Sequence, residues 1–325
     1  MERWHPLPAE SVVDYLNSIG LRPPDLLRRV WRVGGRNRTY AVAEAPGEDP
    51  AFFLKQFGSD DYDELSFASE RHWSGFEGVP SPELLHADEA WRVVVLRNSG
   101  RSLLGLLRNQ SGVDARVVEG LLDALQVVHA QVSDVRPTLP PVVTWFSSDA
   151  KQRRPQGLAN AQLRLLAAVS DDPGLRRAVA RVRGLWDERP TSLIHNDLQL
   201  GHVIVDSTAF SDGGSARIVF VDWEFARSGP AQWDYAGIVQ SLLSEVVLKQ
   251  VPWSDDVALL VRTLYRVGAH DNAPFADLVA LRLLQTAIEL ETAAGQISTL
   301  SAPICQLAVS LAKRPEHLDM LVGAA

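Results

Sequence analysis

The most constraining feature of this 325-residue chain is a pair of short apolar segments, each accompanied by a carboxylate. Residues 193–205 read LIHNDLQLGHVIV, and residues 219–224 read VFVDWE. Short runs rich in Val and Ile are typical of buried strands, and the polar stretch 207–216 between them predicts a hairpin turn. The hairpin would hold Asp197 just before its first strand and Asp222 just after its second. Carboxylates gathered in this way call for a cation, and oxygen ligands suit a hard ion such as Mg²⁺.

The same residues resemble the catalytic signature of the aminoglycoside phosphotransferase and choline kinase group, whose fold is like that of protein kinases. The pattern HxDxxxxN followed by an aspartate at a strand end is matched by His195, Asp197 and Asp222, with His202 in place of the asparagine. The continuation resembles the family segment DWE…GP…DxA, in which the later aspartate, here Asp234, is a structural anchor.

The resemblance implies a role for each matched residue. Asp197 would be the catalytic base that orients or deprotonates an acceptor hydroxyl, and His195 would fix the catalytic loop. Asp222 would be the main metal ligand, with His202 at the second metal position. The implied cofactor is Mg²⁺, with ATP or GTP as the co-substrate.

The amino-terminal third offers an independent check, because such a fold needs a phosphate-covering loop and a lysine in a strand. Gly34 and Gly35 stand between two apolar runs, where glycines let backbone amides approach phosphate oxygens, and Asn37 follows them. Lys55 lies inside the apolar segment 51–57, in a chain where only four of the 32 lysine and arginine residues are lysines. A compact ammonium suits a phosphate contact at this place better than a guanidinium. These two glycines, Asn37 and Lys55 are therefore the predicted phosphate-binding residues.

A lysine in this role requires an acidic partner on the following helix, which residues 60–76 predict. Glu70 stands 15 positions after Lys55 and matches the usual family spacing, and Glu64 is the alternative. The pattern predicts an apolar helical face made of Leu65, Phe67, Ala68, Trp73 and Phe76.

The segment after this helix resembles the hinge of the family. Residues 91–96 predict a central strand, and residues 97–103 predict a turn into a helix. Because hinge backbone groups pair with the purine ring in this family, Arg97 and Ser99 are also predicted at the nucleotide site. Residues 121–130 resemble the LxxLHA helix that packs beneath the catalytic loop.

The implied fold is α+β, a bilobal protein-kinase-like architecture. A small, mostly antiparallel β lobe with one helix would cover residues 1–97, and a larger, mainly α-helical lobe would cover residues 98–325. A hydrophobic content of 46% supports a sizeable core. The apolar runs are too short for a membrane span, and the first nine residues lack a signal-peptide core. The single cysteine, Cys305, excludes an internal disulfide and fits the cytoplasm.

The charge distribution bears on the acceptor. Residues 191–325 hold 8 Lys and Arg against 15 Asp and Glu, a net charge of −7 within a total of −8. An acidic catalytic region argues against nucleic acid as a partner. It would attract a cationic acceptor, although acidic surface also simply keeps proteins soluble.

Three functions follow from these patterns. The leading one is a phosphotransferase that moves the terminal phosphoryl group of ATP or GTP to a hydroxyl of a small, aminoglycoside-like or metabolite acceptor. The second is a kinase-like enzyme that acts on a peptide in a natural-product pathway. The third is a catalytically silent kinase-like protein that binds a nucleotide or partner, which the retained Lys55, Asp197 and Asp222 disfavour.

Overall fold

The computed structural model of the chain groups its residues into two compact units. The first consists of Met1–Arg101 and Ile204–Ala226, and the second of Ser102–Val203 and Arg227–Ala325. A sequence boundary at residue 97 would leave Ile204–Ala226 with the C-terminal part, whereas its contacts group it with the N-terminal part. The residues described are 5–21, 29–33, 37–43, 47–110, 113–133, 135, 137–146, 158–188, 190–206, 215–269, 274–291 and 298–323.

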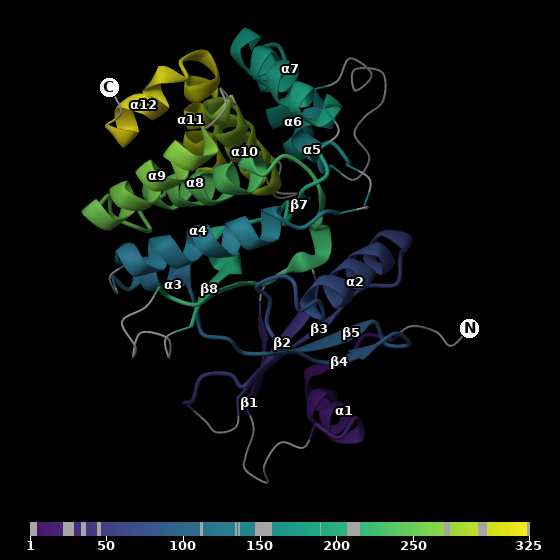
Figure 1. Cartoon of the computed structure of the whole chain (residues 1–325). Coiled ribbons are helices and arrows are strands. Elements are labelled where there is room, and N and C mark those ends of the chain that lie inside the picture. Colours follow the sequence, from purple (N-terminus) through teal and green to yellow (C-terminus); the bar gives the residue numbers. More distant parts are fainter. Residues whose placement is uncertain are drawn as a thin grey trace. The chain divides into compact units, whose positions relative to one another are not determined.

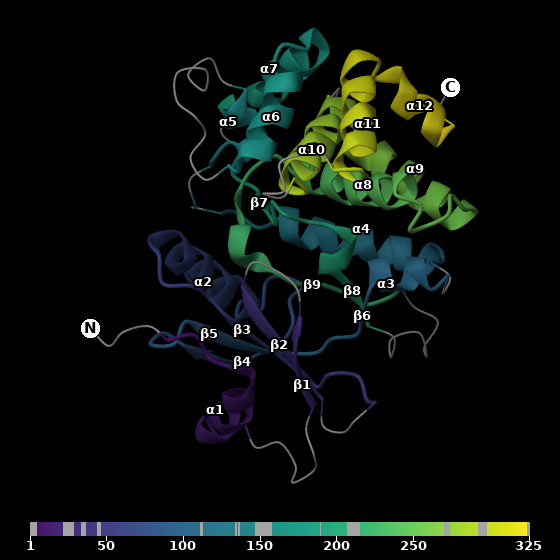
Figure 2. The same ribbon diagram turned by 180° about the vertical axis from the view of Figure 1, so that it is seen from behind.

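The first unit is built on the predicted antiparallel sheet. Its strands follow the order β1-β2-β3-β5-β4, and every neighbouring pair is antiparallel. The two ribbon views show one helix against each face of this sheet (Figures 1 and 2). The strands are β1 (Arg29–Val33), β2 (Arg38–Ala43), β3 (Phe52–Gln56), β4 (Leu84–Asp88) and β5 (Val93–Arg97), with a short β6 (Arg101–Ser102) after them.

Adjacent residues of β3 point to opposite faces of the sheet, so the two faces carry different side chains. Leu54 belongs to the apolar core that includes α1 (Val12–Ser18), which follows the short η1 (Ala9–Ser11). On the same face, Gln56 accepts a hydrogen bond from the Leu7 amide at 2.7 Å. Lys55 lies between these two residues and faces the opposite side.

The face of Lys55 is covered by α2 (Asp61–Ser74). Lys55 is in register with Val94 of β5, and Val94 packs in a second apolar cluster with Phe57 and Phe67. The side chain of Asp60 caps α2 by accepting a hydrogen bond from an amide of the first turn.

The predicted apolar face of α2 was partly wrong. Phe67 and Trp73 are buried as predicted, but Leu65 is 71% exposed, and Ala68 and Phe76 are also exposed. The helix instead turns Glu70 inward, and this carboxylate is completely buried. The polar requirement of Lys55 therefore overrides the apolar pattern that a helical wheel suggests.

The returning segment Ile204–Ala226 adds a predicted hairpin to the first unit. Its strands β8 (Val203–Val205) and β9 (Ile218–Phe220) pair with each other. Residues 207–214 of the predicted turn 207–216 lie outside the described residues. The short η5 (Trp223–Phe225) follows and packs on α2, where Ser69 Oγ donates to the Trp223 carbonyl at 2.8 Å. The segment after β9 is thereby fixed against the helix that carries Glu70.

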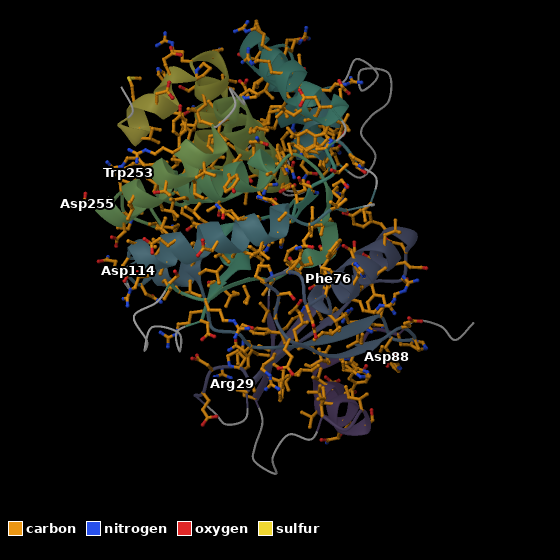
Figure 3. All side chains as sticks on the ribbon, viewed as in Figure 1. Arg29, Phe76, Asp88, Asp114, Trp253 and Asp255 are labelled. Atoms are coloured by element: carbon orange, nitrogen blue, oxygen red, sulfur yellow. The ribbon has the colours of Figure 1, made fainter. Side chains whose placement is uncertain are left out.

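The second unit is mainly helical, as predicted. Two of its helices, α8 and α10, are buried along most of their length and pack against each other, which is typical of helices that are apolar all round. Figure 3 shows Asp114 at the start of α4, where its carboxylate caps the helix by accepting hydrogen bonds from two amides of the first turn. The helices are α3 (Leu103–Arg108), α4 (Ala115–His129), α5 (Pro141–Trp145), α6 (Asn160–Val169), α7 (Pro173–Asp187), α8 (Gln232–Val247), α9 (Asp255–Gly268), α10 (Phe275–Glu289), α11 (Ser301–Lys313) and α12 (Glu316–Val322).

Short strands and turns connect these helices. The strand β7 (Leu193–Ile194) ends directly before His195 and pairs in antiparallel fashion with β10 (Arg227–Ser228). The short η3 (Leu200–His202) follows Asp197. In the part of the chain that the structure describes, every helix is too short or too polar to cross a lipid bilayer.

Candidate functional site

The first candidate group, called the lysine cluster, consists of Lys55, Glu70, Asp222 and Glu224, all in the first unit. The buried Lys55 ammonium lies 3.0 Å from Glu70 Oε2 and 3.0 Å from Glu224 Oε2, and it also donates to Asp222 Oδ1. Burial disfavours the charged form of Lys55, but the three carboxylates outweigh it, so the pKa of Lys55 is raised. The cluster therefore contains a fixed positive charge surrounded by carboxylates.

Glu70 is the helical partner of the lysine. Its carboxylate also accepts a hydrogen bond from Ser74 Oγ at 3.1 Å, one turn further along α2. Burial raises the pKa of Glu70, and the neighbouring Lys55 only partly offsets that effect. The predicted ion pair between Lys55 and Glu70 is present, whereas the alternative, Glu64, pairs with Arg92 at 2.8 Å on the exposed side of the helix.

The other two carboxylates come from the turn that follows β9. Asp222 adopts a left-handed conformation with φ 73° and ψ 52°, which is uncommon for a residue other than glycine and frequent at functional sites. Glu224 is buried and accepts a hydrogen bond from Asn37 Nδ2. Ligand oxygens of Glu70, Asp222 and Glu224 lie within 4.8 Å of one another. Carboxylate oxygens at this spacing fit the predicted Mg²⁺, a hard ion that prefers oxygen ligands.

Of the remaining residues predicted to bind nucleotide, Asn37 contacts the lysine cluster. Gly34 and Gly35 lie outside the described residues, but Asn37, just after them, joins the lysine cluster through Glu224. Arg97 is exposed at the end of β5 and donates from Nε to Glu83 at 2.6 Å. Ser99 is half-buried beyond the strand. The structure thus brings Asn37 to the cluster, while the side chain of Arg97 is engaged with a surface glutamate.

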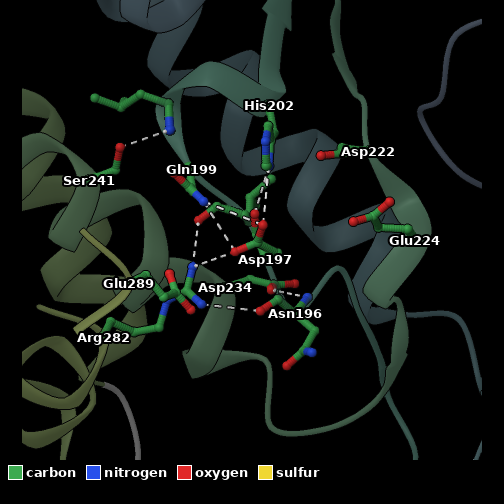
Figure 4. Close-up of polar contacts among 12 residues, drawn as sticks. Asn196, Asp197, Gln199, His202, Asp222, Glu224, Asp234, Ser241, Arg282 and Glu289 are labelled. Carbon is green, nitrogen blue, oxygen red and sulfur yellow. Dashed lines mark hydrogen bonds and ion pairs between the residues drawn. The ribbon is translucent and has the colours of Figure 1, made fainter. Parts of the chain in front are cut away.

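The second candidate group, called the Asp197 loop, comprises residues 195–199 of the second unit. Asp234, near the start of α8, accepts hydrogen bonds from the amides of His195 at 2.8 Å and Asn196 at 2.9 Å, and its carboxylate lies 3.1 Å from His129 Nε2. Figure 4 shows Asp234 beside Asn196. Burial alone would raise the pKa of Asp234, but the bonded His129 and the nearby His195 outweigh it and lower the pKa. An ionised aspartate therefore anchors the loop backbone, as the signature implies, and His195 is completely buried at the base of the loop.

Asp197 itself points its carboxylate toward polar side chains of the second unit. Gln199 Nε2 lies 3.2 Å and 3.4 Å from its two carboxylate oxygens, and Arg282 Nη2 of α10 lies 3.6 Å from Oδ1. His202 Nδ1 donates to the main-chain carbonyl of Asp197 at 2.7 Å. Any metal bond from His202 would therefore fall on its other ring nitrogen, Nε2. His202 belongs to the second unit and Asp222 to the first. That the two residues share a metal ion therefore stays a prediction.

Two residues of these groups were missed by the site prediction from sequence. Glu224 stands in the quoted DWE string, so a signal was present, but its role as a buried partner of Lys55 depends on the turn geometry after β9. Arg282 stands in the otherwise apolar string VALRLLQ, and a lone arginine in a buried helix is itself a signal. Its contact with a loop some 85 residues earlier could not be read from local spacing.

Comparison with known proteins identifies the family and the fold of the chain. Residues 28–251 match the model of the phosphotransferase enzyme family, APH. The fold is similar to a thermostable mutant of aminoglycoside phosphotransferase APH(4)-Ia in a ternary complex with ADP and hygromycin B, with 14% identity, a TM-score of 0.54 and coverage of 97% of this chain and 99% of that chain. It is also similar to an ethanolamine kinase from Plasmodium vivax, with 13% identity, a TM-score of 0.53 and coverage of 89% and 82%. A choline/ethanolamine kinase family protein from Mesorhizobium loti gives 17% identity, a TM-score of 0.52 and coverage of 91% and 92%. No curated protein matches the sequence.

A family match over more than half of the chain settles the class. The fold is kinase-like and the family is one of phosphotransferases, so the family, fold class and enzyme class predicted from the signature are confirmed. The chain belongs to the phosphotransferase enzyme family.

Proposed function

We propose that this phosphotransferase moves the terminal phosphoryl group of ATP or GTP to a hydroxyl of a small acceptor. The observation that carries the proposal is the lysine cluster, in which a buried ammonium is held by Glu70 beside Asp222 and Glu224. In kinases a lysine paired in this way contacts nucleotide phosphates. A buried, permanently charged Lys55 matches that requirement.

The nucleotide is assigned to residues of the first unit. Lys55 contacts the α- and β-phosphates, the loop with Gly34, Gly35 and Asn37 covers them, and the segment with Arg97 and Ser99 faces the base. Asp222 would be the main ligand of Mg²⁺, with His202 proposed for the second metal position, and a bound ion would supply neutralisation of phosphate charge. The oxygen donors of the lysine cluster support this assignment.

The chemical step is assigned to Asp197. The acceptor oxygen forms a bond to the terminal phosphorus while the bond from that phosphorus to the bridging oxygen breaks, which releases a nucleoside diphosphate. Asp197 accepts the hydroxyl proton of the acceptor, and His195 supports the loop that carries it. This transfer has a loose transition state, so positioning and charge stabilisation matter more than base strength.

The acceptor is proposed to be a small molecule, an aminoglycoside-like antibiotic or a metabolite, with a cationic one favoured by charge. The net charge of −7 over residues 191–325, the stretch that contains Asp197 and Asp222, would attract a positive molecule. The nucleotide-covering lobe is proposed to span residues 1–97 and the acceptor-binding lobe residues 98–325. We also infer a cytoplasmic location, because a chain with one cysteine fits a reducing compartment, and we propose neither nucleic acid nor membrane as a partner.

A nucleotide screen followed by an acceptor screen tests the proposal. Thermal shift with ATP, GTP and ADP, each with and without Mg²⁺, should show stabilisation by nucleotide that increases with the metal. Transfer of labelled terminal phosphate should then be assayed with aminoglycosides, choline, ethanolamine and short basic peptides as acceptors, and Asp197→Asn as the matched inactive control. Labelled peptide alone would favour the peptide-kinase alternative. Nucleotide binding without transfer to any acceptor would favour the silent binding protein.

A further inference from the structure

A buried arginine holds the Asp197 loop from the side of α10. Arg282 is 4% exposed and sits in an otherwise apolar stretch of the helix. Its Nη1 donates to the Asn196 carbonyl at 3.2 Å, and its Nη2 donates to the Leu198 carbonyl at 3.3 Å. A buried charge is costly unless it is paired and hydrogen-bonded. The partners of this one are the two peptide carbonyls that flank Asp197.

The same guanidinium also reaches the side chain of Asp197. Nη2 lies 3.6 Å from Asp197 Oδ1 (Figure 4). A planar guanidinium can bind two carbonyls and face a carboxylate through two separate nitrogens held in a fixed geometry, whereas an ammonium has its donors on a single nitrogen. Arg282 therefore fixes both the backbone around Asp197 and the direction of its carboxylate.

Helix α8 is shaped to accept this arrangement. The indole of Trp233 lies under the guanidinium at 5.1 Å and donates from Nε1 to the same Asn196 carbonyl at 3.2 Å. At Gly237 a Cβ atom would stand 2.4 Å from the Leu198 carbonyl oxygen and 2.9 Å from Arg282 Nη2. Only glycine leaves room there for the loop carbonyl and the guanidinium together.

The contacts of Arg282 complement those of Asp234. Asp234 binds N–H groups at the start of the loop, and Arg282 binds C=O groups on either side of the reactive residue. Asn196, between the two anchors, has a left-handed backbone with φ 70°. A loop held in such a conformation needs surrounding contacts that outweigh its conformational cost.

We propose that Arg282 is a positioning residue for Asp197, which sets the place of the catalytic carboxylate and thereby the rate of phosphoryl transfer. This inference rests on the proposed function in one respect, namely that Asp197 carries the chemistry. The competing interpretation is that Arg282 merely stabilises the core of the second unit.

The first test is a double-mutant cycle on the acceptor-dependent rate. Arg282→Gln should lower kcat by about 100-fold, because a small displacement of a reactive group has an effect of that size, with little change in the KM for nucleotide. Arg282→Lys keeps the charge but not the fork of donors and should recover part of the rate. In the Asp197→Asn background, Arg282→Gln should cost less than about threefold, because positioning no longer matters once the carboxylate is gone.

A matched control separates positioning from stability. Arg181 of α7 binds both carboxylate oxygens of the buried Asp277 of α10 at 2.5 Å and 2.8 Å. Arg181→Gln leaves the buried Asp277 of α10 without its cationic partner and should lower Tm while leaving kcat near that of the parent. Equal losses of kcat for Arg282→Gln with and without Asp197 would overturn the positioning role.

A second measurement needs no acceptor. Amide hydrogen exchange over residues 195–200 should be at least about tenfold faster in Arg282→Gln, with the exchange of the remainder of the second unit unchanged. Exchange at the parent rate would overturn the inference. If the parent transfers phosphate to no acceptor while this exchange rises, the proposed function fails but the anchoring role of Arg282 stands.

Discussion

The two candidate groups are held together in different ways. In the lysine cluster, side chains bind side chains, and three carboxylates share one ammonium. In the Asp197 loop, the buried charges of Asp234 and Arg282 bind the main chain instead. The first group is therefore held by opposite charges that offset one another, and the second by hydrogen bonds that fix the backbone conformation of the loop. Substitutions in the first should change binding and stability, whereas substitutions in the second should change rate.

The largest effect is expected for Asp197→Asn, which should separate the role of the Asp197 loop in rate from the role of the lysine cluster in binding. The variant keeps the shape of the side chain but removes the proton acceptor, so kcat should fall by about 10²–10⁴-fold. The Kd for nucleotide should stay near that of the parent, because the lysine cluster is intact. Turnover and nucleotide affinity are measured separately, with Asp187→Asn at the exposed end of α7 as a control that should change neither. Full activity of Asp197→Asn would remove the distinction.

A large loss of stability is expected for Lys55→Met, which removes the one ammonium of the lysine cluster. Removing one partner of a buried ion pair typically costs about 3–5 kcal/mol of unfolding free energy, and the buried Glu70 and Glu224 would be left without their cation. Denaturant unfolding measures the loss. The double variant Lys55→Met with Glu70→Gln should be more stable than the single one, since it removes an unpaired charge. A single variant as stable as the parent would show that the cluster is not a charge balance.

A smaller effect is expected for Asp222→Asn. It should weaken the Mg²⁺-dependent affinity for nucleotide at least about tenfold, a size typical of lost contacts at metal sites, and should leave the metal-free affinity nearly unchanged. Calorimetric titration with and without Mg²⁺ measures both. The control is Glu89→Gln, which removes an exposed partner of Arg71. Equal affinity with and without Mg²⁺ in Asp222→Asn would count against a metal role for Asp222.

The smallest expected effect is the pH dependence of stability, which should have opposite signs in the two groups. The lowered pKa of Asp234, whose burial is outweighed by His129, means that its contribution is complete above its unfolded pKa of about 3.9 and is lost as pH falls through the folded pKa. Burial raises the pKa of Glu70, so its contribution is complete below about pH 4.3 and is lost as pH rises through the folded pKa. Each group contributes a slope of at most about 1.4 kcal/mol per pH unit.

Two variants separate these slopes. Asp234→Asn should reduce the loss of unfolding free energy that occurs as pH falls. Glu70→Gln should remove the loss of unfolding free energy that occurs as pH rises. Urea unfolding at a series of pH values measures both curves. Slopes of the same sign for the two residues would contradict the assigned shifts.

Much of the first group could be predicted from sequence because its signals are local or nearly so. A lysine in an apolar strand and a glutamate 15 positions later identified the pair Lys55 and Glu70. The apolar pattern of α2 taken alone predicts that Leu65 is buried, whereas a helix that turns Glu70 toward Lys55 leaves Leu65 exposed. The burial of one functional pair therefore determined the orientation of the whole helix.

The second group shows where sequence reasoning stops. The signature identified Asp197 and the anchor Asp234, which are 37 positions apart but share one recognisable motif. It did not identify Arg282, because the contact depends on how α10 packs beside α8. Tertiary packing of distant helices, unlike strand alternation or turn chemistry, leaves no fixed spacing to read.

The alternation within β3 has a consequence for how strictly this strand must be aligned. Lys55 reaches the carboxylates on one face, and its neighbour Gln56 reaches Leu7 and His5 on the other. A slip of one residue would exchange the two side chains, placing a charge in the apolar core beside α1 and an amide among the carboxylates. Because these two polar side chains have their partners on opposite faces of the sheet, the strand can pair in one register only.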